Sequence, residues 1–232
     1  MRAVLFDLDG TLLDIDLESF LQRYFSELQG VAQSLKTELD ASAVIQAIKE
    51  STGAMMRPHV GLTNREVFYA DFMRRTGIDL DMEWSAFDRF YTEVFPTLGR
   101  HCRPAEGARV AVESALSLGL RVAVATNPIF PRIAIQHRIA WAGLDDLGLE
   151  IITSYETMHA CKPLPEYFRQ TAEMLGVDPT ECMMVGDDRF LDMPAADTGM
   201  QTFYVGSDTD TSADYCGDLV ALSDLLPRIM AD

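Results

Sequence analysis

The chain has 232 residues, 48% of them apolar and 24% charged, and this balance excludes wholesale disorder. Its net charge of −17 argues against binding DNA, RNA or an anionic membrane through charge, although a small pocket can still be locally positive. The four cysteines are widely spaced and form no CxxC pair, so we expect neither a disulfide framework nor a cysteine-rich zinc site.

No stretch approaches the roughly 18 uninterrupted apolar residues of a membrane span, and the first residues lack the pattern of a secretory signal. These absences predict a soluble cytoplasmic protein. The length allows one large core, or one core with a smaller second unit. The sequence leaves the oligomeric state open between a monomer and a homodimer.

The first predicted element is a buried strand at Val4, Leu5 and Phe6, which leads into two acids, Asp7 and Asp9. Residues two apart on a strand point the same way, so both carboxylates could serve one site beyond the strand's end. Carboxylates this close repel each other. They are best tolerated where a cation, a substrate or a shared proton offsets their charge.

The next stretch, residues 17–95, is predicted to be mostly helical and to contain no strand. Apolar residues recur there at helical spacing, and Gly30, Gly77 and Pro96 lie where helices should end. The predicted helices span residues 17–28, 41–48, 64–75 and 84–95.

From residue 104 onward, predicted helices and strands alternate. The helices span residues 105–118, 131–142, 165–175, 191–198 and 219–230, and the strands span residues 120–125, 150–153, 182–185 and 201–205. This alternation is typical of a parallel sheet with right-handed crossovers. We therefore predict a doubly wound, Rossmann-like α/β core formed by residues 1–15 and 101–232. Residues 16–100 would be an inserted α-helical cap over the strand ends.

Polar residues follow several of these strands. Parallel strands present their carboxyl ends along one edge of a sheet, so we expect these side chains to meet in one crevice. Each also has an ordinary interpretation, as a helix cap, a surface lysine or acids at a helix N-terminus. The residues concerned are Thr126, Asn127, Lys162, Asp187, Asp188 and Asp192.

In chain order, these residues form four motifs: DLDGT at 7–11, Thr126 after a β-rich strand, Lys162-Pro163, and GDDRFLD at 186–192. The set resembles the haloacid dehalogenase-like hydrolase superfamily over nearly the whole chain. The place of the helical insertion is similar to that in the subgroup with an α-helical cap between the first and second motifs.

The resemblance implies roles in phosphoryl transfer. Asp7 would be the nucleophile that becomes an aspartyl-phosphate, and Asp9 would be the general acid and then the base that activates water. Thr126 and Asn127 would hold phosphoryl oxygens, and Lys162 would neutralise charge on Asp7 and on the transferring group.

The resemblance also implies a Mg²⁺ cofactor, because this ion prefers oxygen ligands. Asp7, the backbone carbonyl of Asp9 and Asp187 would supply the protein ligands. Asp188 and Asp192 are further candidate ligands, and either of the adjacent acids Asp187 and Asp188 could face the metal.

These motifs favour a phosphatase acting on a small phosphorylated metabolite. The alternatives are a phosphosugar mutase of the same family and a non-catalytic binding module on the same scaffold. A dehalogenase is less favoured, because family members that act on carbon–halogen bonds usually lack the second acid, Asp9. In the cap, Arg57 and Arg65 belong to a polar cluster around Gly61 that is either an ordinary loop or a substrate-selecting one.

Overall fold

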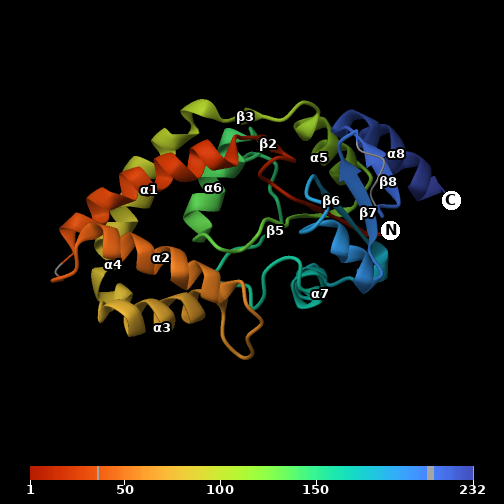
Figure 1. The fold of residues 1–232 in the computed structure, drawn as a ribbon. Coiled ribbons are helices and arrows are strands. Elements are labelled where there is room, and N and C mark those ends of the chain that lie inside the picture. Colours follow the sequence, from red (N-terminus) through yellow and green to blue (C-terminus); the bar gives the residue numbers. More distant parts are fainter. Residues whose placement is uncertain (36, 208–211, 232) are drawn as a thin grey trace.

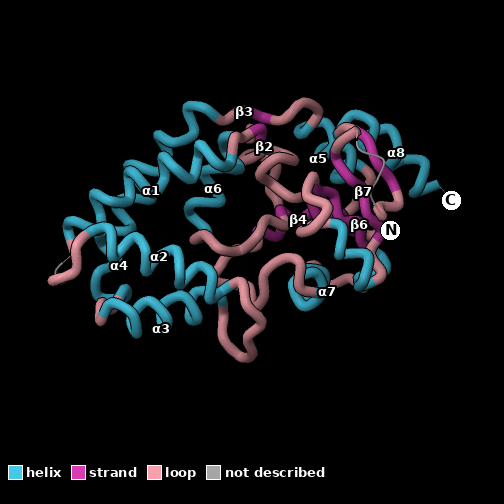
Figure 2. The backbone as a smooth tube through the Cα atoms, in the orientation of Figure 1, coloured by secondary structure: helices cyan, strands magenta, loops and turns pink. Residues whose placement is uncertain are grey.

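A computed structural model describes residues 1–35, 37–207 and 212–231. It contains a six-stranded parallel sheet with the strand order β5-β4-β1-β6-β7-β8. Figure 2 shows strands β4, β6 and β7 of this sheet in magenta. Its strands are β1 (Ala3–Phe6), β4 (Arg121–Val124), β5 (Ile151–Ile152), β6 (Cys182–Gly186), β7 (Gln201–Val205) and β8 (Tyr215–Gly217). The N-terminal strand β1 lies between β4 and β6, so the predicted parallel α/β core is confirmed.

Helices cover both faces of this sheet. Alternate residues of its strands point to opposite sides, so each face presents apolar side chains that a layer of helices buries. On β1, Val4 and Phe6 join one buried cluster, while Ala3 and Leu5 join another. The first cluster includes apolar residues of α5 (Ala108–Ser117), α6 (Arg132–Trp141) and α8 (Leu219–Ala231). The second includes residues of α7 (Pro165–Met174) and the short helix η4 (Met193–Thr198), and the turn η3 (Pro179–Glu181) precedes β6.

A helical segment, residues 17–101, lies to one side of the sheet (Figure 1). It contains α1 (Leu17–Ser34), α2 (Ala41–Met55), α3 (Asn64–Thr76), α4 (Leu80–Arg89), η1 (Phe90–Val94) and η2 (Phe95–His101). Phe95 of this segment stacks on Trp141 of α6, and Phe20 packs edge-to-face against it, with ring centroids 5.5 and 6.2 Å away. The helical segment and the sheet region therefore share one hydrophobic cluster.

The chain enters and leaves the helical segment through two short strands that pair with each other. They are β2 (Leu13–Asp14) and β3 (Arg103–Pro104), which form an antiparallel ribbon. An ion pair of 2.7 Å joins Arg103 to Asp14 across the ribbon. The two crossings thus lie side by side at one edge of the helical segment.

The observed elements differ from the predicted ones mainly at their ends. Helix α1 continues through Gly30, whose Cβ position is open, and α2 extends to Met55. Strands β2, β3 and β8 were not predicted, because two or three residues are too short to establish a period of two. Among the described residues, none of the helices combines the length and the apolarity that crossing a bilayer requires.

Candidate active site

A cavity of about 280 Å³ lies beyond the carboxyl end of β1. Asp7, Asp9 and Gly10 line it directly after that strand. The other lining residues are Ile15, Leu17, Leu21, Thr126, Asn127, Ile129, Phe130, Arg138, Lys162, Asp187, Asp188, Leu191 and Asp192. The cavity therefore brings together all of the predicted site residues except Arg57 and Arg65.

The buried side chain of Lys162 bridges two of the acids, Asp7 and Asp192. Its Nζ donates to Asp7 Oδ1 and to Asp192 Oδ1, at 2.6 Å in each case, and the lysine is 2% exposed. Its backbone N–H donates to Asn127 Oδ1 at 3.3 Å, and the peptide bond to Pro163 is cis. Burial by itself would lower the pKa of Lys162, but Asp192 and Asp7 raise that pKa above its ordinary value, so the ammonium group stays charged.

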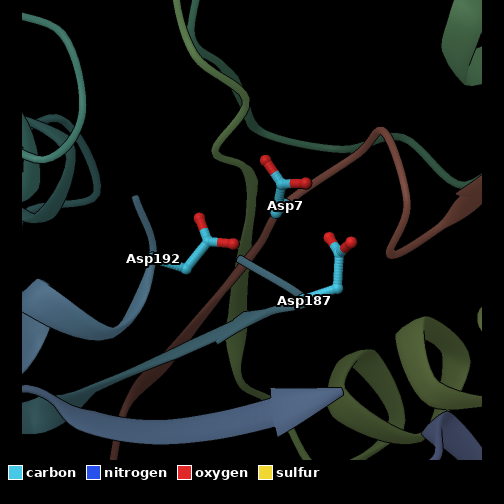
Figure 3. Close-up of side chains that lie close together, drawn as sticks. All are labelled: Asp7, Asp187 and Asp192. Atoms are coloured by element: carbon cyan, nitrogen blue, oxygen red, sulfur yellow. The ribbon is translucent and has the colours of Figure 1, made fainter. Parts of the chain in front are cut away.

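Three carboxylates converge at this point, as Figure 3 shows for Asp7, Asp187 and Asp192. One oxygen of each lies within 4.8 Å of the others. Burial raises the pKa of Asp7 to about 8, against the lowering effect of Lys162. Burial also raises the pKa of Asp187, although Thr11 Oγ1 donates to its carboxylate at 2.9 Å.

This donor set fits a hard divalent cation. The grouped atoms are carboxylate oxygens, which Mg²⁺ prefers as ligands. A bound cation would also offset the repulsion between these carboxylates and the cost of burying their charge. The backbone at Gly10 adds to the fit. Its φ of +91° suits glycine, and a Cβ there would collide with the Asp187 carboxylate.

Asp188 and Asp192 have different environments, although both line the cavity. Asp188 Oδ1 accepts backbone hydrogen bonds from Phe190 and Leu191, at 2.7 and 3.0 Å. Asp192 is 1% exposed, and its Oδ2 accepts from the Asp188 N–H at 3.1 Å. The carboxylate of Asp192 therefore belongs to the converging group, whereas Asp188 Oδ1 stabilises the turn that carries the group.

Thr126 is fixed at the end of β4 by its own backbone. Its carbonyl accepts hydrogen bonds from Thr153 Oγ1 at 2.7 Å and from the Tyr167 hydroxyl at 2.9 Å. Both donors are buried, so Thr126 and the following Asn127 have a rigid support. This places a hydroxyl and an amide on the wall of the cavity that contains Asp7 and Lys162.

The two arginines predicted in the cap do not join this group. Arg65 pairs with Asp81 at 2.5 Å and stacks over the Tyr69 ring at 4.1 Å. Arg57 lies in the loop before α3, where its carbonyl contacts His59 Nδ1 at 2.9 Å. Neither arginine lines the cavity.

One charged cavity residue, Arg138, was missed by the sequence analysis. It lies on α6, is 1% exposed, forms an ion pair with Asp9 and stacks over the Phe130 ring at 4.4 Å. A signal was present, because Arg138 stands between Ile135 and Ile139 on the apolar stripe of a predicted helix. A charge on that stripe indicates a buried partner.

The chain is similar to known proteins in sequence and in fold. Residues 1–197 match the sequence model of the family described as haloacid dehalogenase-like hydrolase. A phosphatase of Mycobacterium tuberculosis is 27% identical over 241 residues, with 97% of each chain covered. A phosphoglycolate phosphatase of Xylella fastidiosa is 24% identical, with 81% of this chain and 72% of that protein covered.

Two further matches concern length and fold. The chloroplastic protein SUPPRESSOR OF QUENCHING 1 of Arabidopsis thaliana is 27% identical over 81% of this chain, which spans only 16% of that protein. The crystal structure of a phosphatase from Thermococcus onnurineus superposes with a TM-score of 0.60 at 22% identity, covering 97% of this chain and 98% of that one. At this identity the likeness concerns the fold.

Proposed function

The chain belongs to the haloacid dehalogenase-like hydrolase family, and from that premise we propose that it is a Mg²⁺-dependent phosphatase that cleaves a small phosphomonoester through an aspartyl-phosphate on Asp7. The observation that carries the proposal is the contact of Lys162 Nζ with Asp7 Oδ1 at 2.6 Å, inside a cavity that also contains Asp9 and Asp187. A nucleophile, its counter-charge and a second acid thus share one enclosed space.

The proposed reaction has two steps. In the first, a carboxylate oxygen of Asp7 attacks phosphorus, the ester P–O bond breaks, and Asp9 gives its proton to the leaving oxygen. In the second, Asp9 takes a proton from a water molecule that attacks the same phosphorus. The acyl phosphate bond then breaks, which releases inorganic phosphate and restores Asp7.

The other cavity residues would hold the phosphoryl group and balance its charge. Thr126 Oγ1, the Asn127 amide and the Lys162 ammonium would contact phosphoryl oxygens. Asp7, the carbonyl of Asp9 and Asp187 would hold Mg²⁺, which supplies positive charge between an anionic nucleophile and an anionic substrate. Asp192 is a further candidate ligand through its place in the converging group, and Asp188 would act mainly through the turn.

We further propose that residues 16–100 act as a cap over this cavity. Leu17 and Leu21 of α1 form part of the cavity wall, which supports a role in excluding bulk water. Opening of the cap would release the product. Substrate selection by Arg57 and Arg65 stays a prediction, because neither lies on the cavity wall in this arrangement.

The test is the variant Asp7→Asn, with hydrolysis of p-nitrophenyl phosphate measured with and without Mg²⁺. Loss of the nucleophile should lower kcat by at least about 1000-fold with the circular dichroism spectrum unchanged. The matched control is Asp88→Asn, because Asp88 is exposed on α4 and lies outside the cavity. Full activity in Asp7→Asn would reject the nucleophile assignment.

The same assays separate the alternatives. A phosphosugar mutase would convert a hexose phosphate into its isomer, whereas a phosphatase would release inorganic phosphate. A non-catalytic binding module would turn over no phosphate ester. The substrate panel begins with 2-phosphoglycolate, because a relative carries the name phosphoglycolate phosphatase.

A further inference from the structure

We propose that Arg138 is the binding site for a second anionic group, a carboxylate, that the substrate carries beside its phosphoryl group. The inference rests on the proposed phosphatase function and deepens it, since it narrows the substrate class. The observation behind it is that two buried nitrogens of Arg138 have no hydrogen-bond partner among the described residues.

The guanidinium of Arg138 is only partly satisfied. Its Nη1 donates to Asp9 Oδ2, but Nε and Nη2 are buried and have no hydrogen-bond partner among the described residues. The side chain lines the cavity, and its Cζ lies over the Phe130 ring, 4.4 Å from the ring centroid. A buried donor without a partner is costly, so a ligand that accepts from these nitrogens gains from completing the set.

The charges around the cavity indicate what the partner should be. Among the described residues that line it, Lys162 and Arg138 are the two cationic side chains, against five aspartates. Lys162 already bridges Asp7 and Asp192. A second negative charge on the substrate would therefore meet Arg138 as its available counter-charge.

The chemistry of Arg138 favours a carboxylate. Its guanidinium presents a planar fork that matches a carboxylate bidentately, and its present partner, Asp9, is itself a carboxylate bound through one oxygen. The other oxygen, Asp9 Oδ1, is also buried without a partner among the described residues. A substrate carboxylate would accept from Nε and Nη2, the two donors without a partner, while Asp9 keeps its place on Nη1.

The distance between the two subsites limits the size of the substrate. Asp7 and Asp9 are two residues apart, so their Cα atoms are separated by at most about 7 Å. Arg138 contacts Asp9 directly. The carboxylate should therefore stand within a few bonds of the phosphoryl group, which agrees with a cavity of about 280 Å³. The apolar wall of Leu17, Leu21 and Ile129 offers no further polar group to a longer chain.

The experiment compares two substrates that differ in one charge, 2-phosphoglycolate and its neutral amide, phosphoglycolamide. We expect the wild-type protein to prefer the carboxylate by roughly 10- to 100-fold in kcat/KM, as for hydrogen bonds to a charged group. In Arg138→Met this preference should fall below about 3-fold. Arg138→Lys, which keeps the charge but not the fork, should give an intermediate ratio.

Arg132→Met is the matched control, because Arg132 lies on the same helix, is exposed and does not line this cavity. It should keep the wild-type preference. Equal turnover of both substrates by the wild-type protein, a comparison that needs no variant to fold, would overturn the inference. So would an Arg138→Met variant that loses both activities in equal proportion, because Arg138 would then act only by positioning Asp9.

Failure of the proposed function gives a different result. A wild-type protein that hydrolyses neither substrate nor p-nitrophenyl phosphate would reject both proposals together. Hydrolysis of all three without a preference for the carboxylate would reject the role of Arg138 alone.

Discussion

Gly10 lies where the backbone passes close to the Asp187 carboxylate of the cavity. It has a φ of +91°, and a Cβ would collide with the Asp187 carboxylate. Gly61 offers a natural comparison, because its φ is +79° but nothing lies within 4 Å of its Cβ position. The two glycines share a left-handed backbone and differ in what surrounds them.

We predict that Gly10→Ala and Gly61→Ala have unequal effects. Gly61→Ala should cost about 1 kcal/mol, the strain of a left-handed non-glycine residue, and should leave phosphatase activity unchanged. Gly10→Ala should cost more and should lower activity at least about tenfold, because Asp187 must move. Urea unfolding and a phosphatase assay measure the two effects. Equal destabilisation with full activity in both variants would contradict the prediction.

At the residue scale, the sequence motifs predicted which acidic residues would line the cavity. They did not predict which arginine would line it. Asp7, Lys162 and Asp187 follow strands or begin helices in a recognisable order, and the sheet edge then brings them together. Arg138 belongs to no such motif, and its contact with Asp9 depends on how α6 packs. Arg65 was one of two arginines that the sequence left open between an ordinary loop and a substrate-selecting one. It pairs with Asp81 of α4, a contact that spacing along the chain does not reveal.

At the element scale, Asp71 on α3 joins two helices of the segment. Its carboxylate binds Arg75 and Arg74 on its own helix and accepts a hydrogen bond of 3.0 Å from Ser51 on α2. Arg75 also pairs with Glu50 of α2. Partial burial would raise the pKa of Asp71, but these partners together lower it to about 2.

This shift predicts a pH-dependent effect of Asp71→Asn. A depressed pKa in the folded state gives a stabilisation that is fully present above the ordinary pKa of 3.8 and is lost as the pH falls toward 2. At pH 7 the variant should be less stable by roughly 1 kcal/mol, since its partners are partly exposed. Below about pH 4 that difference should shrink. Urea titrations at several pH values test this, and a constant difference would refute it.

The type and order of the long elements were predictable because each has a clear period and an end signal. Gly77, with a φ of +71°, ends α3 where the sequence indicated. The exceptions arise where tertiary contacts decide. Residues 90–101 form two short non-α helices, η1 and η2, in place of the end of a predicted helix, and there Phe90 and Phe95 pack into the aromatic cluster. The β2–β3 ribbon depends on residues about 90 positions apart, which no local pattern records.

At the scale of the whole molecule, the helical segment is joined to the sheet region by hydrogen bonds at a second point besides β2 and β3. The buried side chain of Asn64, at the start of α3, donates to the carbonyls of Pro128 and Ala160 at 3.1 and 3.3 Å. The next backbone amide, Arg65 N–H, donates to the Tyr155 carbonyl at 2.7 Å. The start of α3 is thus bound to two loops that follow strands β4 and β5.

We predict that Asn64→Ala loosens this second attachment. Loss of the buried amide should cost about 1–2 kcal/mol, because the carbonyls lose a donor away from water. The Arg65 amide should exchange its hydrogen faster, which hydrogen–deuterium exchange measures. Gln46→Ala is the control, since Gln46 is exposed and its side-chain amide binds only Glu50 among the described residues. Unchanged exchange at Arg65 would show that Asn64 does not hold the two parts together.

The pairing of β2 with β3 has a consequence for the history of such a chain. Leu13 and Pro104 are partners across the ribbon. The two ends of the helical segment between them therefore already lie side by side. A tight turn grafted there would close the remaining chain without disturbing the order of the six strands. The intervening helices can therefore be exchanged as one unit in evolution, while the aspartates that follow β1 stay in place.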